Sequence, residues 1–292
     1  MQGSSLDNAK FDINYFFDCQ NKKVYRTYEI RDIFYQNRET WQLAKSIRFN
    51  KFLDYLVRNT CFEKVVLTFP SKKEIMYSWG NVSIFEIALS IKSDSYFTHH
   101  TAMLFHGLTN RSFRVVYVNH EQAPKRSSSD SLVQERIDAA FKKAPRVSRN
   151  KAKFKDNTIL LINGMHTGRY GVITTLGENN EHIRLTNVER TLIDISVRPV
   201  YSGGVHQVLN AYKLARDKVS IELLVSTLKK IGYIYPYHQI IGFYMERTGL
   251  YREKELMRFN ELGIVFDFYL THGMRKISYS KRWHLYYPIE FD

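Results

Sequence analysis

The most regular pattern of hydrophobic and polar positions in the chain lies between residues 48 and 59. Apolar residues recur there at spacings of three and four and form one face of an amphipathic helix: Phe49, Phe52, Leu53, Leu56 and Val57. Weaker helical patterns precede it at 11–17 and 27–36. Strand-like runs at 65–69 and 75–79 follow, separated by a turn that contains two lysines. This succession predicts a small helical unit that ends in a β-hairpin with a basic tip.

Beyond residue 80 the pattern alternates between short helices and short strands. We expect helices at 82–90, 98–105, 131–144, 205–216 and 221–230, and strands at 114–118, 158–163, 170–175, 266–270 and 277–287. The stretch 121–131 is polar and is predicted to be a flexible loop. The chain is therefore predicted to be α+β, with one domain at 1–80 and a mixed α+β domain at 81–292.

Short helices followed by a two-stranded hairpin are typical of a winged helix-turn-helix, in which one helix enters the major groove and the hairpin contacts the DNA backbone. The predicted groove residues are Arg48, Asn50, Lys51, Tyr55 and Arg58, and the predicted backbone contacts are Lys64, Lys72 and Lys73. Similar small units also serve as dimerisation or protein-docking modules. The segment 36–47 is longer than a tight turn, so the recognition helix either includes residues 38–45 or consists of residues 48–58 alone. The cleaner amphipathic period favours 48–58.

The charge of the chain favours a polyanionic partner. There are 43 Lys and Arg against 29 Asp and Glu, a net charge of +14 at pH 7. A genome rich in A and T also produces such a composition. The segment 142–155 holds seven basic residues and no acidic one: Lys142, Lys143, Arg146, Arg149, Lys151, Lys153 and Lys155. It is either a solvated loop, an arm that follows the DNA backbone, or a surface for an acidic partner.

No stretch of the sequence suggests a membrane or secretion. Apolar runs fall short of the roughly 18 residues that span a bilayer, and the start lacks the apolar region of a signal peptide. The two cysteines, Cys19 and Cys61, are too few for a secreted disulfide framework. We therefore expect a cytoplasmic protein with no membrane partner.

Residues that often do chemistry are present, but their spacing argues against catalysis. His99, His100 and His106 do not share one helix face with a cysteine or carboxylate, so no metal site is predicted. Glu189 and Asp194 point to different faces of a helix, which suits paired acid–base work poorly. An i,i+4 ion pair between Asp194 and Arg198 is expected instead. No hydrolase or Walker motif is present, and we predict neither enzyme activity nor a cofactor.

Several short motifs follow one another between about residues 95 and 249. They are Tyr96…His99…His106-Gly107-Leu108-Thr109, Tyr117-Val118, Thr186-Asn187-Val188-Glu189-Arg190-Thr191-Leu192-Ile193-Asp194, Pro199…Gly203-Gly204 and Ile241-Gly242-Phe243-Tyr244-Met245-Glu246. In this order and spacing, the chain resembles the AbiEi-type antitoxins of type IV abortive-infection toxin–antitoxin systems.

The resemblance implies an N-terminal winged helix-turn-helix that binds double-stranded DNA upstream of its own operon and represses it. It also implies a C-terminal antitoxin domain that counters a nucleotidyltransferase-like toxin, without requiring direct binding to that toxin. The motif residues are expected to hold the second domain in shape: His99, His106, Gly107, Leu108, Glu189, Arg190, Thr191, Asp194, Pro199, Gly203 and Gly204.

The chain departs from this family in its first domain. The segment between Gln36 and Arg48 is long, and Met76-Tyr77-Ser78-Trp79-Gly80 replaces the family's usual Arg-Gly-Val-Tyr at the end of the wing. Two other functions therefore stay open. One is a protein-docking module for an acidic partner enzyme, and the other is a degenerate nucleic-acid-processing enzyme.

Overall fold

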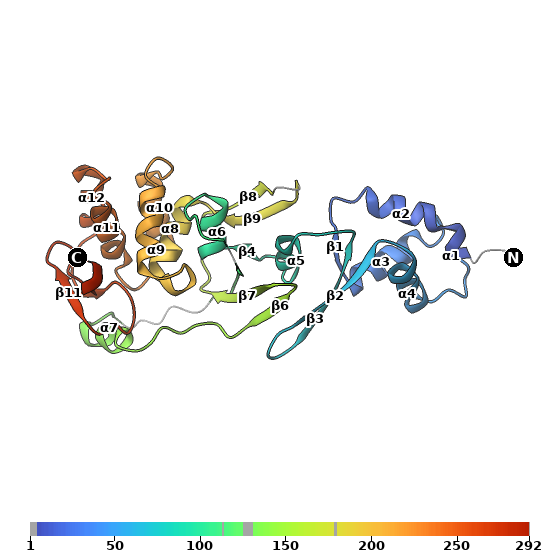
Figure 1. The fold of residues 1–292 in the computed structure, drawn as a ribbon, viewed down its shortest axis with the longest axis horizontal. Helices are drawn as coiled ribbons and strands as arrows, with labels where there is room; N and C mark the ends of the chain where they lie inside the picture. The colour runs from blue at the N-terminus through green and yellow to red at the C-terminus, as the bar shows by residue number, and fades with distance from the viewer. Residues whose placement is uncertain (1–4, 113, 125–130, 178–179, 292) are drawn as a thin grey trace.

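The protein is mixed α+β, as the sequence predicts, and its described residues form three β-sheets. A computed structural model describes residues 5–112, 114–124, 131–177 and 180–291. The molecule is elongated, with the N-terminal helices at one end and the C-terminal helices at the other (Figure 1).

The N-terminal unit packs four helices against a three-stranded antiparallel sheet of order β1-β3-β2. Its elements are α1 (Ser5–Asn8), α2 (Lys10–Asp18), β1 (Val24–Arg26), α3 (Thr27–Asn37), α4 (Phe49–Asn59), β2 (Phe62–Thr68) and β3 (Lys73–Trp79). The pattern at 48–59 is confirmed as α4, with Arg48 at its N-cap. Strand β1 was not predicted, because three residues are too short to show an alternating pattern.

Aromatic side chains form the core of this unit. Phe17 and Phe52 are fully buried, and Phe52 stacks on Trp41 with ring centroids 5.7 Å apart. Trp41 belongs to the long connection between α3 and α4, in which Leu43 and Ile47 are also buried. Burial of these three side chains fixes the connection to the core, although it is too long for a tight turn.

The hairpin β2–β3 joins the N-terminal unit to the rest of the molecule. Val65 and Leu67 lie on one face of β2, and with Phe69 of the following turn they belong to the same hydrophobic core as strands of the central sheet. Arg26 adds a polar link, because its guanidinium donates to the carbonyls of Ser90 and Ile91. The hairpin therefore packs against the second part of the chain along its length, with α5 beside β1 (Figure 1).

The central sheet has six strands in the order β6-β7-β5-β4-β9-β8. Strand pairs β5–β7 and β4–β9 are parallel, and the other pairs are antiparallel. The elements are α5 (Ile84–Ser90), β4 (Tyr96–Phe97), α6 (His99–Phe105), β5 (Val115–Glu121), α7 (Gln134–Phe141), β6 (Lys151–Phe154), β7 (Asn157–Gly164), β8 (Val172–Leu176) and β9 (His182–Thr186).

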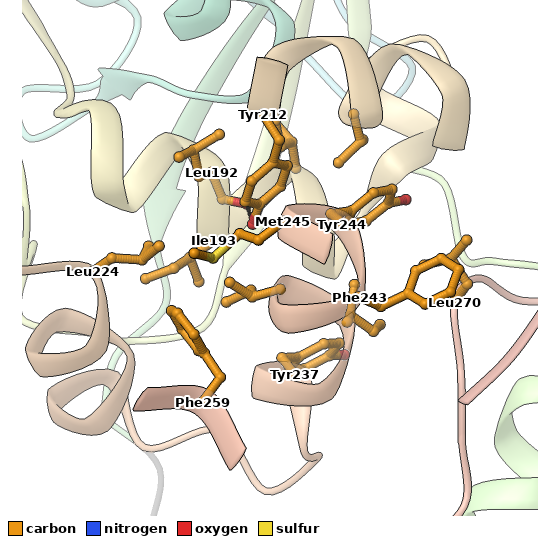
Figure 2. Close-up of a cluster of buried hydrophobic side chains, with 14 of the residues drawn as sticks. Leu192, Ile193, Tyr212, Leu224, Tyr237, Phe243, Tyr244, Met245, Phe259 and Leu270 are labelled. Carbon is orange, nitrogen blue, oxygen red and sulfur yellow. Dashed lines mark hydrogen bonds between the residues drawn. The ribbon is translucent and has the colours of Figure 1, made fainter. Parts of the chain in front are cut away.

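The C-terminal part consists mainly of helices around the buried helix α8, with a small sheet of order β10-β12-β11. Its elements are α8 (Val188–Val197), η1 (Pro199–Tyr201), α9 (Val205–Leu214), α10 (Ile221–Ile231), α11 (Tyr237–Thr248), α12 (Glu253–Asn260), β10 (Phe268–Tyr269), β11 (Ile277–Ser280), β12 (Leu285–Pro288) and η2 (Ile289–Phe291). Figure 2 shows Leu192, Tyr212 and Tyr244 packed together in this core, and the rings of Tyr212 and Tyr244 stack 5.4 Å apart.

Several predictions about the chain beyond residue 120 need correction. The run 277–287 is a hairpin, not one strand, because residues 281–284 turn and His284 has a φ of +43°. Strand β10 pairs with β12 in parallel. The basic segment includes a strand, β6, and the expected helix 131–144 is the shorter α7. The expected loop 121–131 begins after β5, and its residues 125–130 lie outside the described part of the chain.

Candidate nucleic-acid interface and buried polar network

Helix α4 presents a basic stripe to solvent. Arg48, Lys51, Tyr55 and Arg58 recur at spacings of three, four and three, so they lie along one side of the helix. Arg48, Lys51 and Arg58 are exposed, as is Asn50 beside them. The opposite side of α4 faces the aromatic core through Phe49, Phe52 and Leu56. The apolar pattern of the helix thus decides which polar residues can reach a partner.

Two neighbours modify this stripe. The Tyr55 hydroxyl donates a hydrogen bond of 3.0 Å to Asp7 Oδ1 on α1. Burial, and then this hydrogen bond, raise the pKa of Tyr55 to about 12. Tyr55 therefore already has a partner within the protein. Asp54 is also exposed on α4 and places a negative charge near the basic residues.

The hairpin contributes three further exposed lysines. Lys64 lies on β2, and Lys72 and Lys73 lie at the tip. Lys72 forms an ion pair with Glu74, whose other oxygen lies 3.0 Å from the Arg26 guanidinium. Glu74 thus offsets part of the charge of Lys72.

The tertiary structure places part of the basic segment next to the hairpin. Strand β6 packs beside β2, and a cavity of about 600 Å³ lies between them. Lys151 and Lys153 of β6 line this cavity together with Val66 of β2 and Tyr117 of β5. In Figure 1, α4, the hairpin and β6 follow the lower side of the molecule. The basic residues of the two halves therefore form neighbouring surfaces, which no local sequence pattern indicates.

A second group of polar residues is buried around α8. Arg190 Nε donates to Asp194 Oδ1 at 2.7 Å, and both side chains are less than 10% exposed: 4% and 7%. The hydroxyl of Thr98 donates to the other Asp194 oxygen at 2.7 Å. Burial alone would lower the pKa of Arg190, but the neighbouring Asp194 raises it above its ordinary value.

The expected ion pair between Asp194 and Arg198 is therefore wrong. Asp194 pairs one turn earlier, with Arg190, and Arg198 donates to the carbonyl of Arg146 at 3.1 Å. Arg198 lies at the C-cap of α8, where its φ of −138° is no longer helical. Since the helix ends there, Arg198 does not continue the i,i+4 geometry that the sequence spacing assumed.

Glu121 extends the network beyond α8. Its carboxylate accepts hydrogen bonds from the Tyr96 hydroxyl and the Thr167 amide, both at 2.9 Å, and from the Arg169 amide at 3.1 Å. Burial would raise the pKa of Glu121, but these hydrogen bonds lower it below its ordinary value. Thr167 also accepts from Arg190 at 3.1 Å, so it links Glu121 to the Arg190–Asp194 pair. Sequence reasoning did not select Glu121 or Thr167, because nothing in their local pattern distinguishes them.

His99 occupies an unusual position at the start of α6. Its φ is +51°, a conformation that non-glycine residues rarely adopt, and its side chain is buried. Burial lowers the pKa of His99 to about 4. His106, by contrast, forms a 2.6 Å hydrogen bond with the Thr186 carbonyl. Across the described ranges, no cluster of three or more His, Cys, Asp or Glu side chains could hold a metal ion.

The remaining motif residues lie on α8 or in other parts of the domain 81–292. Glu189 accepts from the Ser220 amide at 2.9 Å, which ties α8 to the start of α10. The Thr191 hydroxyl lies 2.8 Å from that of Thr186. The others are buried or form turns: Leu108 and Pro199 are buried, and Gly107, Gly203 and Gly204 have φ values of +60°, +86° and +92°. Glycine adopts such values without the steric cost that other residues incur.

Comparisons with known proteins find a similar fold but identify no function. In the described part of the chain, no helix is both long and apolar enough to cross a membrane. No protein-family model matches the chain, and no curated protein matches it. The chain is similar to the crystal structure of the RV2827C protein from Mycobacterium tuberculosis, with a TM-score of 0.57 and 11% sequence identity. The similarity covers 96% of this chain and 91% of that chain, and at this identity it concerns the fold alone.

Proposed function

We propose that this protein is a DNA-binding autorepressor and antitoxin of a type IV toxin–antitoxin operon, of the AbiEi type, and that it acts in the cytoplasm. The observation that carries the DNA-binding part is the exposed basic stripe of α4 next to a hairpin with basic residues at its tip. Such a pairing suits a duplex, which offers a groove for a helix and phosphates for basic side chains.

The order of elements supports a winged helix-turn-helix at 1–80. Helices α3 and α4 are followed directly by the hairpin β2–β3, and β1 completes the sheet. We divide the chain at Gly80, whose φ of +69° accommodates the change of direction into the domain 81–292. The long connection between α3 and α4 is buried through Trp41, so it does not prevent this assignment.

We assign the groove contacts to Arg48, Asn50, Lys51 and Arg58, which are exposed on α4. Tyr55 would join them only after release from Asp7. The phosphate contacts are assigned to hairpin residues Lys64, Lys72 and Lys73, and neighbouring Lys151 and Lys153 of β6 would extend them.

The antitoxin assignment is supported by the resemblance in sequence motifs around α8. Most of these residues are buried and pair with one another, which suits a role in holding the domain together. A nucleotidyltransferase-like toxin encoded by a neighbouring gene would be the functional partner, without a requirement for a stable complex. We assign no catalytic residue and no cofactor.

The test is binding to DNA from upstream of the gene and to scrambled DNA of equal length, followed by fluorescence anisotropy across a salt series. The Arg48→Ala/Lys51→Ala variant should weaken binding to the operator more than binding to the scrambled DNA, because groove contacts read the sequence and phosphate contacts do not. Replacement of two exposed lysines at the other end of the molecule, Lys254→Ala/Lys281→Ala, is the matched control. Equal, weak binding to both DNAs by the wild-type protein would reject the repressor.

A second experiment distinguishes a protein-docking module from a DNA-binding repressor. The protein and the product of the neighbouring gene are co-expressed and passed through a gel-filtration column at moderate salt. Stable co-elution, together with the absence of sequence-specific DNA binding, would favour a module that docks on an acidic partner enzyme.

A further inference from the structure

A cleft of about 690 Å³ lies where the N-terminal unit meets the central sheet. One wall contains Lys22, Arg26 and Tyr28, and the other contains Lys92 and Arg184. We call it the junction cleft. Its volume falls within the roughly 300–1,000 Å³ of typical small-molecule sites. None of the residues assigned to DNA contact above lines it.

The carboxylates of the cleft already have partners. Glu29 pairs with Lys22 and accepts from the amide of Arg26 at 2.8 Å. Glu74 pairs with Arg26 at 3.0 Å, and Glu86 caps its own helix by accepting from the Ser83 amide at 2.9 Å. Glu181, the fourth carboxylate of the cleft, accepts from the Ser83 hydroxyl at 3.3 Å. Bound carboxylates leave less negative charge to repel an anion from the cleft.

Two cations of the cleft are free to bind an anion. Within the part of the chain that the structure describes, neither the ammonium of Lys92 nor the guanidinium of Arg184 donates a hydrogen bond to the protein. Lys92 is exposed, whereas Arg184 is half-buried, and its burial lowers the pKa of the guanidinium. The nearby carboxylate of Asp94 offsets part of this lowering, but Asp94 forms its ion pair with Arg169. A half-buried guanidinium without an acceptor is unfavourable in the absence of a ligand. A phosphate group would satisfy it through two parallel hydrogen bonds.

The cleft also offers a planar aromatic surface. Tyr28 lines it from the first turn of α3, and 58% of this side chain is exposed. An exposed ring next to unpaired cations suits a ligand that combines an aromatic ring with a phosphate, because nucleobases stack on such rings. We propose that the junction cleft binds a nucleotide, with its phosphates at Arg184 and Lys92 and its base against Tyr28.

The test is isothermal titration of the full-length protein, without DNA, with ATP, GTP and inorganic triphosphate. We expect saturable binding of at least one nucleotide. The affinity should fall roughly tenfold or more in Arg184→Ala/Lys92→Ala, since the loss of even one charge-assisted hydrogen bond lowers affinity by about a factor of ten. Lys254→Ala/Lys281→Ala is the control that removes equal charge elsewhere, and its affinity should match the wild type. Tyr28→Phe should keep the affinity, and Tyr28→Ala should lower it.

Three results would overturn the proposal. The first is absence of saturable nucleotide binding to a wild-type protein that is folded by circular dichroism. The second is equal affinity for triphosphate and nucleotide, which would indicate a site for phosphate alone. The third is loss of operator affinity in Arg184→Ala/Lys92→Ala with unchanged nucleotide binding, which would make the cleft part of the DNA surface. The titration contains no DNA, so its result is separate from that of the repressor test.

Discussion

Charged side chains are used in opposite ways in the N-terminal unit and around α8. On α4 and the hairpin, Arg48, Lys51 and Lys73 extend into solvent. Around α8, Arg190 and Asp194 are buried, paired with each other and surrounded by hydroxyl groups from other elements. The first arrangement leaves charge available to a partner, and the second uses charge to fix the position of a helix.

The physical reason for this difference is solvation. An exposed ion pair contributes about 0–1 kcal/mol, because water and salt screen it. A buried ion has lost its hydration, so removing its partner leaves an uncompensated charge in the interior. Substitutions in the two regions should therefore separate clearly: those near α8 should affect folding, and those on α4 should affect binding.

The largest effect is expected at Arg190. Arg190→Met keeps the apolar stem but leaves Asp194 without its ion-pair partner, and the free energy of unfolding should fall by about 3–5 kcal/mol. Arg258→Ala is the control, since Arg258 and Glu261 are both about half exposed, at 51% and 54%. That control should lose less than about 1 kcal/mol in the same urea titration. A loss of unfolding free energy of similar size in both variants would show that the buried pair is no more important for stability than the exposed one.

His99 should make stability depend on pH. In the unfolded chain its pKa is near 6.5, and in the folded protein burial lowers it to about 4. The contribution of the neutral, buried His99 to the free energy of unfolding is complete above pH 6.5. It is lost as pH falls from 6.5 toward 4, because in this range the unfolded chain binds a proton at His99 and the folded protein does not. The total is about 3 kcal/mol, at 1.36 kcal/mol per pH unit.

The variant His99→Asn isolates this contribution, since asparagine tolerates the positive φ at this position. Urea titrations between pH 7 and pH 4.5 should show a shallower loss of stability for the variant than for the wild type. Parallel curves would show that His99 takes up a proton in the folded state as readily as in the unfolded chain.

A smaller effect is expected at Glu121. Glu121→Gln removes the negative charge that accepts hydrogen bonds from Tyr96, Thr167 and Arg169, and the loss should be about 1.5–3 kcal/mol. Glu63→Gln, on the exposed side of β2, serves as the control and should change stability little. Thermal melts of the two variants provide the measurement, and equal melting temperatures would contradict a role for Glu121 in the network.

The smallest change in stability is expected for Arg48→Ala/Lys51→Ala. Both side chains are exposed on α4, so the free energy of unfolding should change by less than about 0.5 kcal/mol, as is usual at surface positions. The same variant should weaken operator binding if α4 reads the groove. Substantial unfolding in this variant would show that the basic stripe stabilises the N-terminal unit and is not simply a binding surface.

Elements with strong local patterns were predicted well. Helix α4 and the hairpin β2–β3 emerged from the spacing of their apolar residues, and α9 and α10 lie close to their predicted positions. Strand β1 was missed because three residues establish no period, whereas β10 lies within the strand expected at 266–270. Helices α11 and α12 were also missed. Most of α11 is buried, so its apolar residues do not form a single stripe.

The sequence by itself determined the α+β class, the outward face of α4 and the positive charge of the chain, because these properties depend on local spacing and composition. Only the tertiary structure decided the partner of Asp194, the link between Arg190 and Glu121, and the position of β6 beside the hairpin. The pair of Asp194 with Arg190 lies within α8, and the other two contacts join residues from different elements. Each depends on where helices end and sheets pack, and hydrophobic burial across the whole chain sets that arrangement.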